Sequence, residues 1–99
     1  MNTSAEGLRV LVTAGAAGIG LAIATAFQTG GSKVFICDID ADALAAMARN
    51  FPKIGSVKTD VADPASVDAM FDDAIGFLGG LDVLVNTPVS RVQPPRSRT

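Results

Sequence analysis

Residues 8–20 read Leu-Arg-Val-Leu-Val-Thr-Ala-Gly-Ala-Ala-Gly-Ile-Gly, and this stretch decides the fold. The run Val10-Leu11-Val12 is typical of a strand that is buried on both faces. A short turn of alanine and glycine follows, and a helical pattern of apolar residues begins at Ile19. A strand that enters a helix through so small a turn is typical of a β-α-β unit, which builds a parallel sheet.

The same alternation of strand and helix continues as far as Asn86. Strands are expected at residues 8–13, 34–38, 56–60 and 81–86, and the segments between them carry apolar stripes at helical spacing. The stripes consist of Ile19, Ala22, Ile23, Ala26 and Phe27, of Leu44, Met47, Ala48 and Phe51, and of Val67, Met70, Phe71, Ala74, Ile75 and Leu78. Asp40 and Asp63 are expected to cap the second and third helices. This order predicts an α/β fold, an incomplete doubly wound parallel sheet of about four strands and three helices.

The composition of the 99 residues bounds the function. With 48% hydrophobic and 18% charged residues, the chain is expected to form one folded domain. A single cysteine, Cys37, and the absence of histidine exclude a disulfide framework and a Ser-His-Asp triad, and no metal site is predicted. Without a signal peptide or an apolar run of about 18 residues, we expect a cytoplasmic protein and no membrane partner. The net charge of −2 argues against a nucleic-acid partner.

The turn after the first strand has the features of a phosphate site. Its small residues let the backbone approach an anion closely, and the first N–H groups of the following helix would point at that anion. Glycines also serve turns and helix packing, so a purely structural turn is the alternative. A P-loop is excluded, because Leu21 stands where a lysine would have to follow the last glycine. The residues expected to contact a dinucleotide here are Thr13, Gly15, Ala17, Gly18, Ile19 and Gly20.

The second expected strand ends in Asp38, eighteen residues after Gly20. A carboxylate at this point can accept hydrogen bonds from both hydroxyls of an adenosine ribose, and it repels a 2′-phosphate. We therefore expect a Rossmann fold that binds NAD in preference to NADP, with Asp38 and Ile39 in the site. A domain similar to the methyltransferases, in which such a turn and acid hold S-adenosylmethionine, is an alternative.

Over residues 7–86 the chain resembles the short-chain dehydrogenase/reductase family, whose first strand is followed by Thr-Gly-x-x-x-Gly-x-Gly. Thr13, Gly18 and Gly20 match this motif. Ala14 replaces the first glycine of the motif, and Gly15 is expected to restore the flexibility that this replacement removes. The resemblance implies an oxidoreductase that transfers hydride between a nicotinamide cofactor and a small alcohol or carbonyl compound.

Two further motifs carry the resemblance. Asp60-Val61 resembles the Asp-Val pair that follows the third strand of the family and contacts the adenine. Residues 81–86, Leu-Asp-Val-Leu-Val-Asn, resemble the fourth strand, which the family continues as Asn-Asn-Ala-Gly. The resemblance thus adds Asp60, Val61 and Asn86 to the cofactor site.

The resemblance ends after Asn86, where Thr87-Pro88-Val89 stands in place of Asn-Ala-Gly. Residues 87–99 hold three arginines, three prolines and no acid, which is typical of a disordered basic tail; residues 1–6 are expected to be a flexible N-terminus. One base lost near the Asn86 codon would explain this tail, because its codons in the neighbouring frame permit Asn-Ala-Gly. We therefore expect a truncated chain whose reading frame is shifted, with a natural disordered tail as the alternative.

The family's catalytic Ser and Tyr-x-x-x-Lys are not found in this sequence, which contains no tyrosine. The tyrosine is the family's general acid and base, so we expect no catalytic residue and no activity in this chain. Intact family members are usually homo-oligomers, and their interface helices have no counterpart here. The alternative to an enzyme is a non-catalytic fragment that binds a nucleotide.

Overall fold

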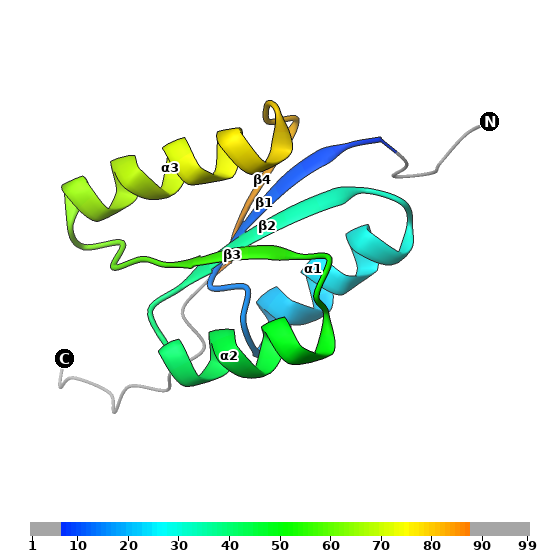
Figure 1. The fold of residues 1–99 in the computed structure, drawn as a ribbon, viewed down its shortest axis with the longest axis horizontal. Coiled ribbons are helices and arrows are strands. Elements are labelled where there is room, and N and C mark those ends of the chain that lie inside the picture. Colours follow the sequence, from blue (N-terminus) through cyan, green and yellow to red (C-terminus); the bar gives the residue numbers. More distant parts are fainter. Residues whose placement is uncertain (1–6, 88–99) are drawn as a thin grey trace, which may run out of the picture.

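The computed structural model describes residues 7–87, which form one parallel sheet with helices on both faces (Figure 1). The strands are β1 (Arg9–Thr13), β2 (Lys33–Asp38), β3 (Gly55–Lys58) and β4 (Val83–Asn86). The helices are α1 (Gly18–Thr29), α2 (Ala41–Asn50) and α3 (Pro64–Leu78). The strand order β3-β2-β1-β4 confirms the predicted doubly wound fold. The expected flexible segment 1–6 and most of the expected tail, 88–99, lie outside the described residues.

The core has two layers, one on each face of the sheet. Val10, Val12, Val34 and Ile36 face α1 and α2 and pack in one cluster with Ala24, Leu44 and Met47. Helix α3 covers the other face of the sheet (Figure 1). There Leu11, Phe35 and Cys37 pack in a second cluster with Met70, Ala74 and Leu78. Full burial of such a side chain contributes about 1.5–3 kcal/mol. The central strands β1 and β2 are therefore the most deeply buried elements of the described chain.

The apolar stripe expected on the first helix is partly wrong. Helix α1 packs on the sheet through Gly20 and Ala24, whereas Ile19, Ala22 and Ala26 are exposed. Ile23 and Phe27 of the expected stripe are partly buried and pack against the core cluster that contains Ala24, as does Leu21, which the stripe did not include. In the other two helices, Ala48 and Ile75 are likewise exposed.

The expected helix caps are confirmed. Asp40 accepts hydrogen bonds from the N–H groups of Asp42 (3.0 Å) and Ala43 (3.1 Å), and Asp63 accepts one from Ala65 (3.1 Å). The third strand ends at Lys58, two residues earlier than expected, and the chain then turns into α3. None of the helices within residues 7–87 is long and apolar enough to cross a membrane.

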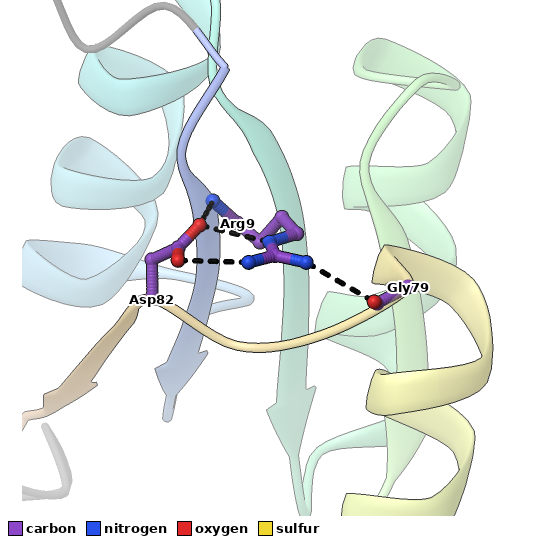
Figure 2. Close-up of polar contacts among 3 residues, drawn as sticks. All are labelled: Arg9, Gly79 and Asp82. Carbon is purple, nitrogen blue, oxygen red and sulfur yellow. Dashed lines mark hydrogen bonds and ion pairs between the residues drawn. The ribbon is translucent and has the colours of Figure 1, made fainter.

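A forked ion pair ties the start of β1 to the loop before β4 (Figure 2). The Arg9 guanidinium donates to both carboxylate oxygens of Asp82, from Nε at 2.9 Å and from Nη2 at 3.0 Å. Its Nη1 donates to the carbonyl of Gly79 at 3.1 Å, and the Arg9 N–H donates to Asp82 at 2.9 Å. These bonds fix the entry of the chain into β4 and hold the pKa of Asp82 down, to about 2, chiefly through the hydrogen bonds from Arg9.

We expect Asp82→Asn to lower the thermal unfolding midpoint near neutral pH. Because the folded pKa of Asp82 lies below its ordinary value of 3.8, the carboxylate stabilises the fold above that pH. This stabilisation is lost as the pH falls from 3.8 towards about 2. The difference in midpoint between the two chains should therefore shrink over this range. Asp73→Asn, at an exposed site on α3, is the control, and a pH-independent difference for Asp82→Asn would contradict the prediction.

Candidate functional site

The carboxyl ends of the four parallel strands share one edge of the sheet, where ligands of open α/β sheets bind. The turn 14–17 follows β1, Ile39 follows β2, and the loop 59–63 follows β3. Every residue that the sequence placed in the cofactor site lies at this edge. They are Thr13, Gly15, Ala17, Gly18, Ile19 and Gly20 on the β1–α1 side, Asp38 and Ile39 after β2, Asp60 and Val61 after β3, and Asn86 at the end of β4.

Ala14, directly after β1, is the left-handed residue of the turn that is not a glycine, with φ 53°. This is the position at which the motif Thr-Gly-x-x-x-Gly-x-Gly has its first glycine. The expectation that Gly15 restores the lost flexibility is wrong, because Gly15 does not adopt a positive φ. Gly15 is needed for space instead: a Cβ there would lie 2.7 Å from Cβ and Cγ2 of Ile36. The left-handed conformation is therefore kept at the position of the motif's first glycine, where it strains the alanine that replaces that glycine.

Ala14→Gly is expected to stabilise the chain by roughly 0.5–1 kcal/mol. A left-handed alanine costs about 1–2 kcal/mol, and part of the gain is offset because glycine is more flexible in the unfolded chain. The midpoint of urea unfolding should rise without a change in its slope. Ala45→Gly, at an exposed helical position of α2, should instead destabilise by about 1 kcal/mol. An equal loss of unfolding free energy in Ala14→Gly and Ala45→Gly would contradict the strain at Ala14.

The other two glycines of the turn have different tasks. A Cβ on Gly20 would overlap the carbonyl oxygen of Ala14 and lie 2.8 Å from its carbon, so this glycine lets α1 begin directly against the turn. Gly18 has φ 61° and is exposed at the start of the helix. Of the three glycines, therefore, Gly15 and Gly20 serve internal packing, and Gly18 leaves backbone open to the edge of the sheet.

Helix α1 starts at this edge without a side-chain cap. Its N-cap, Ala17, offers no acceptor, and its first turn contains no acid, whereas α2 and α3 start at Asp40 and Asp63. Ala17, Gly18 and Ile19 are exposed. The first N–H groups of a helix have no partner within the helix, and its dipole places positive charge there. The arrangement therefore suits a bound anion such as a phosphate.

Asp38 lies beside this helix start at the end of β2 and is half-buried. Its Oδ2 accepts the N–H of Ala16 at 3.1 Å, and its Oδ1 accepts the N–H of Asp40 at 3.0 Å. An ionised carboxylate has about four acceptor sites, so both oxygens can still receive a hydroxyl group. The contact with Ala16 could not be read from the sequence, because it joins residues 22 positions apart.

Three large apolar side chains are exposed in the segments that follow β1, β2 and β3 at the same edge of the sheet. Ile19 is 67% exposed, Ile39 45% and Val61 59%. Large exposed apolar residues that gather in one place commonly mark a binding surface. Asp60, next to Val61, accepts the N–H of Ala62 at 2.9 Å and so fixes the loop after β3. The neighbouring Cys37 is buried, and burial raises the pKa of its thiol, which agrees with the role of a small core residue.

On the other side of β1, the ends of β1 and β4 are joined by hydrogen bonds. The Thr13 hydroxyl donates to Oδ1 of Asn86 at 2.8 Å and accepts the N–H of Thr87 at 3.1 Å. The Thr87 hydroxyl donates to the Thr13 carbonyl. Thr13 is thus engaged with β4, and the side-chain amide N–H₂ of Asn86 is left as a donor. The sequence gives no signal for Thr87 in the site, because Thr87 follows the last residue that matches a motif.

Comparisons with known proteins fit this geometry. The family model of the short chain dehydrogenases matches residues 9–94. A short-chain dehydrogenase/reductase of Colletotrichum higginsianum is 40% identical over 89 residues, which cover 86% of this chain and 33% of that protein. The galactitol 2-dehydrogenase of Agrobacterium fabrum is 46% identical over 77 residues, which cover 77% of this chain and 30% of that protein. This chain therefore spans about a third of the length of these curated relatives.

Solved structures share the same arrangement. The crystal structure of 3-ketoacyl-(acyl-carrier-protein) reductase from Brucella melitensis, complexed with NADH, matches with a TM-score of 0.77. The two are 33% identical, and the match covers 82% of this chain and 34% of that chain.

Proposed function

Because this chain belongs to the short-chain dehydrogenase family, we propose that residues 7–86 bind the nicotinamide dinucleotide of an oxidoreductase. One observation carries the proposal: the uncapped start of α1, the Asp38 carboxylate and an apolar rim meet at one edge of the sheet. A dinucleotide needs an anion site, an acceptor for ribose hydroxyls and an apolar surface for adenine, and it needs them side by side. Family membership favours this reading over the methyltransferase-like alternative.

The residues present fit such a cofactor. The backbone of Ala17, Gly18 and Ile19 would hold the pyrophosphate at the helix start, with Gly15 and Gly20 shaping the turn from within. Asp38 would accept the hydroxyls of the adenosine ribose. The adenine would lie at the apolar rim formed by the exposed residues Ile39 and Val61, next to Asp60.

The nicotinamide half would continue across β1 towards β4. Asn86 lies there with its amide N–H₂ as a donor, and Thr13 fixes the orientation of that amide by donating to its oxygen. When bound, the cofactor supplies or accepts a hydride. For a protein of the relatives' full length, we propose that hydride is transferred between this cofactor and a small alcohol or carbonyl compound. For the 99-residue chain as written, the second candidate is nucleotide binding without catalysis, which its lack of tyrosine favours.

We expect the chain to bind NAD at least about tenfold more tightly than NADP, because a 2′-phosphate next to Asp38 adds repulsion between like charges. Titration calorimetry with both cofactors measures this ratio. Asp38→Ala should bring the two affinities closer together, whereas Asp40→Ala, which removes a carboxylate from the cap of α2, should leave the ratio nearly unchanged. Tighter binding of NADP than of NAD by the unmodified chain would contradict the proposed cofactor preference.

A further inference from the structure

The glycine-rich turn is attached to the end of β2 by two hydrogen bonds. The N–H of Gly15 donates to the carbonyl of Cys37 at 3.1 Å, and the N–H of Ala16 donates to Oδ2 of Asp38 at 3.1 Å. The second bond is partly buried and ends on a charged acceptor. Hydrogen bonds to a charged group contribute more than those between neutral groups. Asp38 therefore contacts the turn strongly before any nucleotide is bound.

The turn cannot hold itself in place. Residues 14–18 are alanine or glycine, so none of their side chains can accept or donate a hydrogen bond. Ala14 is strained at φ 53°, and a strained residue persists only where its surroundings fix it. In the described part of the chain, a side chain does fix the turn through its backbone: Asp38 accepts a hydrogen bond from the N–H of Ala16.

The position of this bond determines how α1 begins. Ala16 precedes the N-cap Ala17, so a fixed Ala16 sets the direction in which the first N–H groups of α1 point. The carboxylate itself is held by its other oxygen, which accepts the N–H of Asp40 at 3.0 Å. Asp38 thus bridges the start of α1 and the start of α2.

We infer that Asp38 is a positioning residue for the phosphate-binding turn, in addition to being an acceptor for ribose. This inference rests on the proposed function. If Asp38 positions the turn, replacing Asp38 weakens the binding of phosphate groups that make no contact with the Asp38 side chain. Charge alone gives the opposite sign, because removing a carboxylate near a bound anion reduces repulsion. The two readings of Asp38 can therefore be separated by the direction of the effect.

The test uses ADP and 2′,3′-dideoxyadenosine 5′-diphosphate, which lacks the two ribose hydroxyls. Calorimetry measures both affinities for the 99-residue chain and for Asp38→Ala. We expect Asp38→Ala to weaken the binding of the dideoxy compound at least about fivefold, and to weaken the binding of ADP by a larger factor. Unchanged or tighter binding of the dideoxy compound would overturn the inference. If the unmodified chain binds neither ADP nor NAD, the proposed function itself fails.

Amide hydrogen exchange of the ligand-free chain gives a readout without any nucleotide. In Asp38→Ala the N–H of Ala16 should exchange at least about tenfold faster, while the N–H groups of Leu11 and Phe35 in the core strands stay protected. Asp38→Asn, which keeps one acceptor oxygen for two N–H donors, should be intermediate.

Asp40→Ala is the matched control, because it removes the same charge two residues away and Asp40 accepts no bond from the turn. It should leave the exchange of Ala16 unchanged. Equal exchange of Ala16 in Asp38→Ala and in the unmodified chain would refute the positioning role. Loss of protection at Leu11 in Asp38→Ala would reveal global unfolding. In that case the exchange of the Ala16 N–H in Asp38→Asn tests the positioning role, and exchange as slow as in the unmodified chain would refute it.

Discussion

Replacing Gly20 with alanine is expected to abolish dinucleotide binding and to destabilise the chain by about 3 kcal/mol or more. The added Cβ would overlap the carbonyl oxygen of Ala14 and lie 2.8 Å from its carbon and 3.0 Å from Cα of Gly15. All three atoms belong to the backbone, so no side chain can move aside. The helix must then separate from the turn, and the first N–H groups of α1 lose their common direction.

Urea unfolding measures the stability, and calorimetry with NAD measures the binding. Gly76→Ala is the matched control, because Gly76 lies in α3 and a Cβ there would meet no atom within 4 Å. This variant should be stabilised by about 0.5–1 kcal/mol and should bind as the unmodified chain does. A Gly20→Ala chain that binds NAD normally would show that α1 need not touch the turn.

The second large effect concerns chemistry. The purified 99-residue chain is expected to show no hydride transfer above background with any alcohol or ketone. The backbone at the start of α1 can hold a pyrophosphate, but holding the cofactor does not move a proton. General acid–base catalysis by a positioned side chain contributes about 10²- to 10⁴-fold, and the tyrosine that the family uses is missing from this sequence.

The assay follows the absorbance of NADH with a panel of polyols, alcohols and ketones. Fluorescence of bound NADH is measured on the same sample, so that absent chemistry is distinguished from absent binding. Reproducible turnover that disappears in Gly20→Ala would contradict the prediction, since it would show catalysis by the folded chain and not by a contaminant.

Most of the fold follows from local patterns in the sequence. The apolar runs of the strands and the caps Asp40 and Asp63 are local signals; the structure confirms both caps and all four strands, with the strand ends within two residues of the expected ones. The edge of the sheet that carries the candidate site could also be predicted, because the carboxyl ends of parallel strands must meet at one edge.

What could not be predicted depends on contacts between distant segments. Gly15 has no room for a Cβ because Ile36, 21 residues further along the chain, lies against it, and the left-handed conformation falls on Ala14 instead. The start of α1 can lie against the turn because Gly20 has no Cβ to meet the carbonyl group of Ala14. The bond from Ala16 to Asp38 requires β1 and β2 to be paired in register first. Sequence periodicity carries no information of this kind.

The central place of β1 has a consequence for synthesis on the ribosome. Val10 pairs with Val34 of β2 on one side and with Val83 of β4 on the other. At about 5–20 residues per second, β4 emerges roughly 2–10 s after β2 is complete. During that interval one hydrogen-bonding edge of β1 has no partner within the nascent chain, and such an edge can pair with another molecule. β1 therefore waits for β4, and this edge of the nascent chain stays open to aggregation until β4 emerges.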